Sequence, residues 1–315
     1  MTYTTGGNIQ AADYNAFSTL AGGMNEIFAD IHSGATTLPQ AGFGYGQTPA
    51  LTAVSAGNNI TAAQWDALFQ TIRKSGTHQG TTTVPPLPVS DPVIGNNITA
   101  HNTPTTLAAL ISTLGANRYN LALGQSTLIT GSNFVQPGGA QPWTNTLTFN
   151  YQVDFGSWNN ARYFFNSGGT LNLNGSYSPI VTPEDTQWST MLTNMSPLVF
   201  NWNSTTPNVG TGGTAIGFYG LTTSYQTIYQ KTFGGGGYYT NSYIQVQAKL
   251  NAAAGTNGLV DFVITLVDAD TSLPKDPKNG TTTYRIDNKK SSGAIVYPGT
   301  VTVASVGGLN GFVAT

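Results

Sequence analysis

The apolar positions of this chain change period along its length, from helical spacing in the first third to strand spacing afterwards. Between residues 14 and 31 apolar side chains recur every three or four residues, which predicts one amphipathic helical face weakened midway by Gly22 and Gly23. Its members are Tyr14, Phe17, Leu20, Met24, Ile27, Phe28 and Ile31. The same spacing returns at Trp65, Leu68, Phe69 and Ile72.

The starts of these two helical stretches are copies of one another. Ile9–Phe17 matches Ile60–Leu68, and each follows glycine and asparagine. In the second copy Thr61 is placed to cap a helix, with Gln64 at the third helical position to complete a capping box. A third, weaker helical stretch is expected at residues 107–114.

From about residue 120 apolar and polar residues alternate, which is typical of half-buried strands. The alternation is clearest at residues 147–155 and returns at 171–173, 244–250 and 260–266. Turn-prone pairs such as Asn174-Gly175 and Asn257-Gly258 separate these runs. We therefore expect a mainly β protein. Residues 1–119 form an N-terminal helical and irregular docking region with duplicated helix starts, and residues 120–315 form an antiparallel β-sandwich or jelly-roll-like body.

Composition narrows the classes of partner. Charged residues make up 8% of the chain, against about 25% in typical domains, and the net charge is −2. We expect no nucleic-acid partner, because no basic stripe is present. No run of about 18 apolar residues predicts membrane insertion, and the N-terminus does not resemble a signal peptide. A surface with so few charges predicts that the protein forms a homo-oligomer or is covered by other proteins. The alternative is a β-sandwich that Thr, Asn and Ser side chains keep soluble.

Four segments carry a resemblance to a known family. Gly44–Gln47, Ile60–Trp65, His78–Thr81 and Trp158–Gly169 resemble stretches of tail- or fibre-associated virion structural proteins of tailed bacteriophages, cyanophages among them. The third segment lacks one residue of the family's His-Gln-x-Gly turn. The resemblance covers about the first 175 residues and implies location in a virion, with other virion proteins as partners, and no described activity. From this resemblance we expect the protein to be assembled into the virion in the host cytoplasm.

Seven residues are our candidates for assembly and docking: Tyr14, Phe17, Trp65, Phe69, Arg162, Tyr163 and Phe165. We predict a strand from Arg162 to the glycine turn at Gly168-Gly169, with Tyr163 and Phe165 on one face. Arg162 is expected to stack on a ring or to pair with a carboxylate such as Asp154. A ligand carboxylate or a neighbouring subunit is the alternative partner.

The sequence holds little of what catalysis needs. Its histidines, His32, His78 and His101, are expected in capping or turn positions near the helices rather than beside a nucleophile or a metal. Glu184 and Asp185 follow Pro183 and are better explained as the acidic start of a helix capped by Thr182 than as a glycosidase pair. We therefore expect no enzyme, no cofactor and no metal site.

Two loops leave alternatives open. Ten of the 24 charged residues lie between Asp261 and Lys290, and Asp268, Asp270 and Asp276 suggest either a solvated hairpin loop with local ion pairs, an inter-subunit salt-bridge patch or a calcium site. The glycines 234–237 precede Tyr238-Tyr239, which predicts a flexible tip that could stack on a sugar.

Together these features predict a structural component of a phage virion associated with the tail, baseplate or fibre. The alternatives are a receptor- or glycan-binding module that contacts a host surface glycan, a head or neck decoration protein and, least supported, a polysaccharide-degrading enzyme.

Overall fold

The computed structural model of the 315-residue chain describes residues 10–20, 22–30, 43–48, 51–80, 107–136, 143, 145–234, 240–269, 278, 280–306 and 312–314. The chain divides into two compact units. Unit 1 consists of Met1–Thr127, Arg162–Gly168 and Lys290–Pro298, and unit 2 of Leu128–Ala161, Gly169–Lys289 and Gly299–Thr315. Unit 1 thus includes two later segments that the expected docking region, residues 1–119, does not contain.

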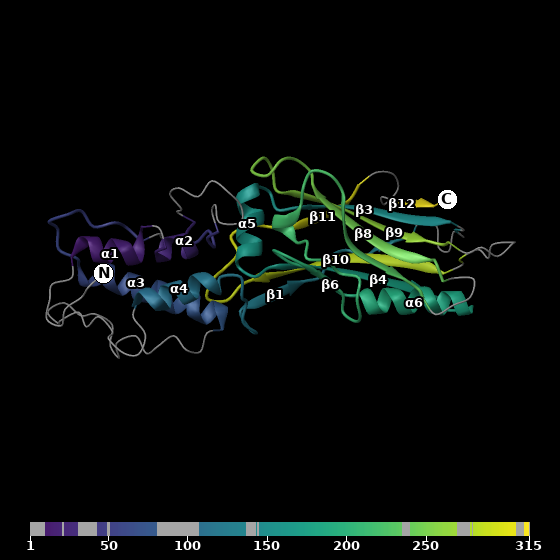
Figure 1. The fold of residues 1–315 in the computed structure, drawn as a ribbon, viewed down its shortest axis with the longest axis horizontal. Coiled ribbons are helices and arrows are strands. Elements are labelled where there is room, and N and C mark those ends of the chain that lie inside the picture. The colour runs from purple at the N-terminus through teal and green to yellow at the C-terminus, as the bar shows by residue number, and fades with distance from the viewer. Residues whose placement is uncertain are drawn as a thin grey trace. The chain divides into compact units, whose positions relative to one another are not determined.

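Helices make up most of the regular structure in the described part of unit 1 (Figure 1). They are α1 (Ala11–Ser18), α2 (Met24–Phe28), α3 (Ala62–Gln79) and α4 (Leu107–Ala116). The single face expected over residues 14–31 is divided between α1 and α2, because the chain turns at Gly22, where φ is +80°. Leu20 lies in this turn and is 54% exposed, so it is not part of the buried face, and Ile31 lies outside the described residues.

The predicted capping box begins α3. The Thr61 hydroxyl accepts the Gln64 backbone N–H at 3.2 Å, and the Gln64 side chain accepts the Thr61 backbone N–H at 2.9 Å. Gly80 ends the helix in the left-handed conformation, with φ of +73°. The start of α1 is similar, since the Asp13 carboxylate accepts the backbone N–H of Gln10 at 3.1 Å. The duplication in the sequence is therefore also a duplication of helix starts.

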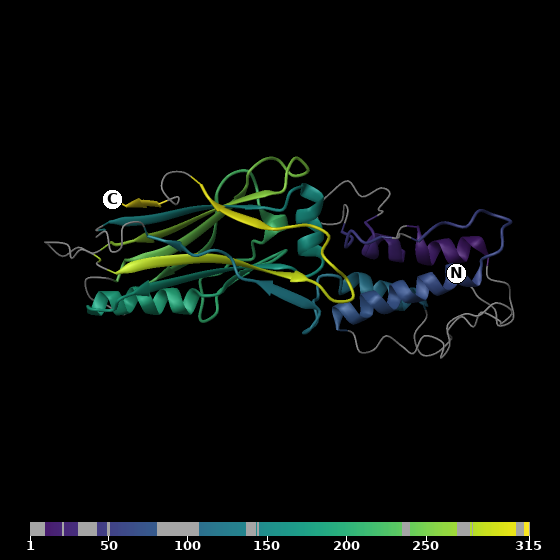
Figure 2. The same ribbon diagram turned by 180° about the vertical axis from the view of Figure 1, so that it is seen from behind.

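Two six-stranded sheets make up most of the regular structure in the described part of unit 2 (Figure 1 and Figure 2). The β10 sheet has the order β1 (Ser126–Ile129), β10 (Thr281–Ser291), β4 (Thr170–Ser178), β5 (Leu198–Phe200) and β6 (Thr205–Thr206), with β2 (Phe134–Val135) also on β10. The β9 sheet has the order β11 (Thr302–Ser305), β3 (Thr146–Asp154), β9 (Leu259–Val267), β8 (Tyr243–Leu250) and β7 (Gln226–Thr232), with β12 (Phe312–Ala314) also on β3.

The two sheets face one another across an aromatic core. Phe149 of β3 lies 4.7 Å from Tyr284 of β10, measured between ring centroids, and Phe200 of β5 lies 5.4 Å from Phe262 of β9. Every second side chain of β3 is buried, as the alternation predicts. Register pairs show β3 antiparallel to β9, and β4 antiparallel to β10. The expected mainly β, sandwich-like architecture is confirmed.

Two local predictions were wrong. Residues 162–166 are not a strand but the second half of helix α5 (Trp158–Asn166), because Ala161, Phe164 and Phe165 are buried together at helical spacing. The pair Asn174-Gly175 is not a turn but lies inside β4. A Cβ atom at Gly175 would come within 2.6 Å of the Tyr284 ring and 2.8 Å of Leu192, so glycine permits close packing at this position.

Helix α6 (Pro183–Met195) begins as predicted. Thr182 accepts the Asp185 backbone N–H at 3.1 Å, and the Asp185 carboxylate accepts the Thr182 backbone N–H at 2.9 Å. The helix lies along β4 in both ribbon views (Figure 1 and Figure 2) and buries Trp188, Leu192 and Met195. A short 3₁₀ turn, η1 (Phe218–Gly220), precedes β7.

Candidate functional site

The structure places most of the predicted docking residues in the interior of unit 1. Tyr14, Phe17, Trp65 and Phe69 are at most 3% exposed and belong to the core shared by the four helices. Phe165 and Arg162 of α5 are also buried, whereas Tyr163 is partly exposed. In this structure these side chains hold the unit together.

The duplicated positions contact one another. Tyr14 and Trp65 are equivalent residues of the two copies, and their rings lie 5.8 Å apart. Two asparagines fix the segment between the copies: Asn15 exchanges side-chain hydrogen bonds with the backbone N–H and C=O of Val54, and Asn25 does the same with Leu51. The sequence pattern did not identify these asparagines, because polar residues beside an apolar face usually face solvent.

Three of the segments that carry the family resemblance meet in unit 1, and we call this meeting point the motif junction. It consists of Gly44–Gln47, His78–Gly80 and Arg162–Gly168. Tyr45 is fully buried at its centre. Its hydroxyl donates to the carbonyl of Arg118 at 2.8 Å and accepts from the Gln79 side chain at 2.9 Å, and its ring lies 4.9 Å from that of His78.

Two further hydrogen bonds tie distant segments to the motif junction. The Asn166 side chain donates to the carbonyl of Gly44 at 3.1 Å, 122 residues away in sequence. The Gln47 side chain donates to the carbonyl of Val296 at 2.7 Å, 249 residues away. The junction therefore pins parts of the chain that the sequence separates widely, which explains why unit 1 recruits Arg162–Gly168 and Lys290–Pro298.

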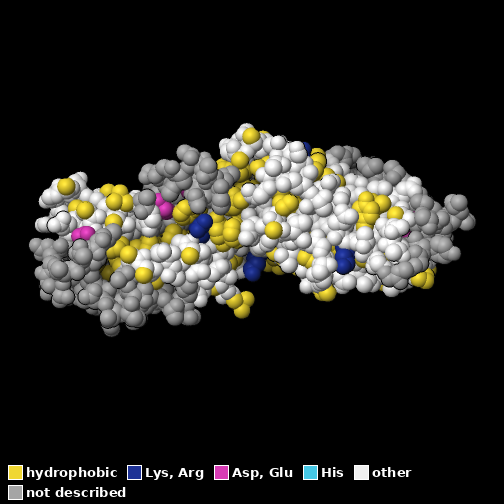
Figure 3. Space-filling view, viewed as in Figure 1, with side chains coloured by type: hydrophobic (Ala, Val, Ile, Leu, Met, Phe, Trp, Pro, Cys, Tyr) yellow, Lys and Arg dark blue, Asp and Glu magenta, His cyan; other side chains and the backbone are white. Residues whose placement is uncertain are grey.

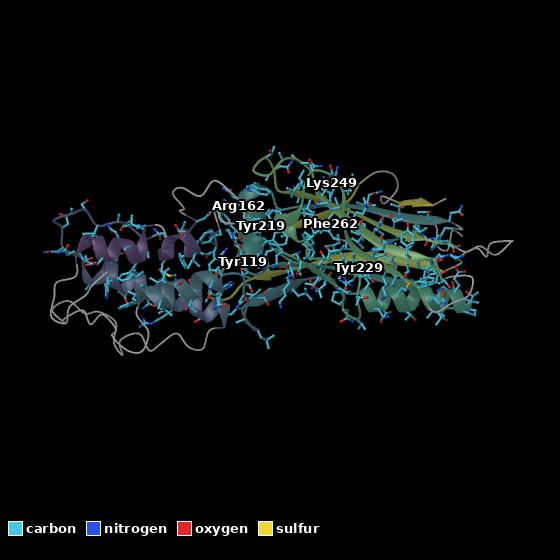
Figure 4. All side chains as sticks on the ribbon, viewed as in Figure 1. Tyr119, Arg162, Tyr219, Tyr229, Lys249 and Phe262 are labelled. Atoms are coloured by element: carbon cyan, nitrogen blue, oxygen red, sulfur yellow. The ribbon has the colours of Figure 1, made fainter. Side chains whose placement is uncertain are left out.

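Arg162 makes the ion pair of the motif junction. Its guanidinium binds both carboxylate oxygens of Asp30, at 2.8 and 3.3 Å, and the two side chains are 9% and 5% exposed. Figure 4 labels Arg162 on α5. The expected bidentate carboxylate pair and a ring contact are both found, since the guanidinium carbon lies 5.6 Å from the centroid of the Tyr163 ring. Only the choice of Asp154 was wrong, because its carboxylate accepts the backbone N–H of Gly156 instead. A paired, bidentate arginine offers no free charge to a ligand.

Glycine is required where Tyr163 packs on the motif junction. Gly46 has φ of +67°, and a Cβ atom there would lie 2.4 Å from the Tyr163 ring. Burial, together with the nearby Asp30 carboxylate, raises the pKa of Tyr163 to about 12. Tyr163 is therefore a neutral packing group at ordinary pH.

His78 is in the last turn of α3 and is fully buried, rather than being a cap or part of a turn. Burial lowers the pKa of its imidazole from 6.5 to about 4, against a smaller opposing effect of the Ser167 backbone. The side chain is neutral at pH 7. His32 and His101 lie outside the described residues.

The other candidate chemistry does not form a site within the described residues. Glu184 and Asp185 are both buried but have different partners: Glu184 pairs with Lys278 at 2.9 Å, and Asp185 accepts the Tyr177 hydroxyl at 2.6 Å. They do not form an open carboxylate pair. Among the residues that the structure describes, no group of three His, Asp or Glu side chains is placed to hold a metal ion.

The structure describes only some of the residues in the two loops for which the sequence left alternatives open. Asp270 and Asp276 of the calcium alternative, and residues 235–239 of the glycine-rich tip, lie outside the described residues. Asp268 is described and pairs with Lys278 at 2.8 Å, with the lysine side chain 1% exposed. For these two residues the predicted local ion pair is found, but the predicted solvation is wrong, since both side chains are buried.

Comparison with known proteins adds no relative: no family model, no curated protein and no solved structure matches this chain. In the described part of the chain, no helix combines the length and the hydropathy needed to cross a bilayer.

Proposed function

We propose that this chain is a non-enzymatic structural component of a tailed-phage particle, associated with the tail, baseplate or fibre. The observation that carries the proposal is the motif junction. The segments by which the chain resembles tail- and fibre-associated virion proteins are used for architecture, since their side chains join helices and later segments of unit 1. An assembly protein needs a fixed shape rather than an exposed reactive group, and these contacts fix the shape of unit 1.

The surface of the described residues supports an assembly role. Charged side chains are sparse on the face shown in Figure 3. In unit 2, β1 and β11 end the strand orders of the two sheets, and Leu128, Ile129 and Val135 near the β1 edge are 55%, 40% and 44% exposed. Apolar residues at a sheet edge favour contacts with other subunits. Homo-oligomerisation and contact with other virion proteins are part of the proposal.

The experiment is mass spectrometry of purified particles of the phage that encodes the chain, after tails and heads are separated. We expect the chain in the tail fraction at a copy number fixed relative to known tail proteins. Recovery with heads or necks would make it a decoration protein there. Absence from particles, with the chain present in the lysate, would refute the structural role.

A matched pair of phage variants tests whether the motif junction matters for incorporation. Arg162→Met breaks the buried ion pair of unit 1, and we expect particles that lack the chain. Lys249→Met removes a partly exposed charge that pairs with Asp261 at 3.7 Å, and we expect normal incorporation. Equal incorporation of both variants would contradict the role given to the junction.

A receptor- or glycan-binding module is the second candidate, and one observation favours it. Tyr225, before β7, is 43% exposed, and polar residues surround it in sequence, which is the setting in which a ring can stack on a sugar. One face is occupied by Lys249, whose Nζ lies 4.7 Å from the ring centroid. Binding to a host-glycan array that Tyr225→Ala abolishes would support this candidate, and no retention would remove it.

A further inference from the structure

A lysine lies between two carboxylates in the interior of unit 2. The Nζ atom of Lys278 is 2.8 Å from Oδ2 of Asp268 and 2.9 Å from Oε1 of Glu184. The side chains of Lys278, Asp268 and Glu184 are 1%, 0% and 3% exposed. Neither the motif junction nor the proposed function uses this cluster, which we call the lysine triad.

Backbone hydrogen bonds fix the positions of Lys278 and Asp268. The Lys278 N–H donates to the carbonyl of Trp143 at 3.1 Å, and the Asp268 N–H donates to the carbonyl of Asn145 at 2.8 Å. One short segment, residues 143–145, therefore holds Asp268, which directly follows β9, and Lys278, which lies three residues before β10, at a set separation. The Ser242 hydroxyl donates to Oδ1 of Asp268 at 3.2 Å, which leaves Oδ2 facing the lysine.

The surroundings of the lysine triad are aromatic. The rings of Trp143 and Trp188 lie 5.2 Å apart, and both residues are at most 1% exposed. In so dry a place, one ammonium and two carboxylates carry a net negative charge that water does not screen. Transfer of a proton from nitrogen to a carboxylate removes charges from the interior, so the neutral amine and acid are much closer in free energy than they are in water.

The pKa shifts of Glu184 and Lys278 indicate where the protons of the lysine triad lie. Burial raises the pKa of Glu184, which makes it the carboxyl group prepared to hold a proton. Burial acts to lower the pKa of Lys278, but its hydrogen bonds with Asp268 and Glu184 raise it overall. The resting triad is therefore an ion pair, and the neutral amine is the minor form from which a reaction would start.

We propose that Lys278 and Asp268 condense to an intramolecular amide bond, with Glu184 as the catalytic proton carrier. Glu184 takes a first proton from Nζ and passes it to Oδ2 of Asp268, and the neutral amine attacks Cγ of that carboxyl group. The Nζ–Cγ bond forms as the Cγ–Oδ2 bond breaks. Glu184 takes a second proton from the attacking nitrogen and delivers it to the departing hydroxyl, so that one water leaves and the third proton stays on the amide nitrogen. No oxidant, metal or cofactor is needed.

The donors of the triad match the needs of this step. During attack, negative charge develops on Oδ1, the oxygen to which Ser242 already donates a hydrogen bond. Burial excludes bulk water, which would otherwise compete with the amine and hydrolyse the activated carbon. The product would join the end of β9 in one sheet to the start of β10 in the other and so fasten the two sheets of unit 2 together.

The test is the intact mass of the purified full-length protein under denaturing conditions. We expect the chain to be lighter than its sequence by one water. Lys278→Met and Asp268→Ala should each restore the full sequence mass. Glu184→Gln should do so as well, although it keeps both reacting groups. Lys249→Met, which removes the lysine of the Lys249–Asp261 pair, is the matched control and should still lack one water.

Tryptic digestion locates the bond, because cyclisation of an aspartate elsewhere would also remove one water. Trypsin cuts after Lys275 but not after an acylated lysine. We therefore expect Leu250–Lys275 and Asp276–Arg285 as one branched peptide pair. An unmodified intact mass, together with free Asp276–Lys278, would overturn the proposal. This measurement does not depend on the variants folding, and its result is independent of where the protein sits in a particle.

Discussion

Unit 1 should lose stability in mild acid because of one buried imidazole. His78 is fully buried against Tyr45 and is neutral in the folded chain, with a pKa of about 4, whereas an exposed histidine has a pKa of 6.5. Between these values the unfolded chain binds a proton that the folded chain excludes. The stabilisation is therefore fully present above pH 6.5 and is lost as the pH falls toward 4.

The size of the effect follows from the difference between the two pKa values. Each pKa unit corresponds to about 1.4 kcal/mol, so the full loss at pH 4 is about 3 kcal/mol, of which about 2 kcal/mol is already lost at pH 5. This is a large share of the stability of an ordinary domain, which is about 5–15 kcal/mol. Unit 1 should open before the chain reaches the acid range in which most carboxylates titrate.

The assay compares amide hydrogen exchange in α3 at pH 7 and pH 5, corrected for the intrinsic pH dependence of exchange. His78→Phe keeps a ring against Tyr45 and cannot take up a proton, so the variant should lose far less protection between the two pH values than the unsubstituted chain. The double variant His32→Gln/His101→Gln should behave like the unsubstituted chain. If His78→Phe and the unsubstituted chain lose protection equally, the buried imidazole is not the cause.

Two further perturbations test the motif junction. Arg162→Met leaves the Asp30 carboxylate buried without its cation and should lower the free energy of unfolding of unit 1 in urea by about 3–5 kcal/mol. The double variant Arg162→Met/Asp30→Asn should lose clearly less. Equal losses of unfolding free energy would show that the pair is not coupled. Gly46→Ala places a methyl group against the Tyr163 ring at positive φ and should destabilise unit 1 strongly. Gly57→Ala, with φ of +86° and nothing within 4 Å of the added atom, should cost about 1 kcal/mol, and a similar cost at both glycines would remove the steric argument.

The strands of unit 2 could be predicted because their pattern is local. Along β3 one face is buried between the sheets, so a polar residue at every second position is enough to reveal the strand. The caps of α3 and α6 were predictable for the same reason, since the Thr61–Gln64 and Thr182–Asp185 pairs are three residues apart. Each of these features depends on neighbours in sequence.

Where the apolar pattern fits both a helix and a strand, contacts with residues distant in sequence determine the secondary structure. Tyr163, Phe164 and Phe165 fit either period, and aromatic residues favour strands, but the burial of Ala161, Phe164 and Phe165 together requires a helix. The partner of Arg162 is 132 residues away in sequence. Asp30 is a polar residue near the end of the first helical stretch, and nothing in its local pattern favours it over Asp154 as the partner of Arg162.

The buried charges sharpen the argument from composition. Counting only described residues, eight of the 24 charged side chains are buried: Glu26, Arg162, Glu184, Asp185, Asp261, Asp268, Lys278 and Asp287. At most 16 remain for the surface of a 315-residue chain, where a soluble monomer usually has roughly a quarter or more of its surface residues charged. A third of the few charges thus lie in the interior, where pairs such as Arg162–Asp30 and Lys278–Asp268 join distant segments. The surface is left to neutral polar and apolar groups, which is the division expected of a protein whose exterior is covered by other subunits.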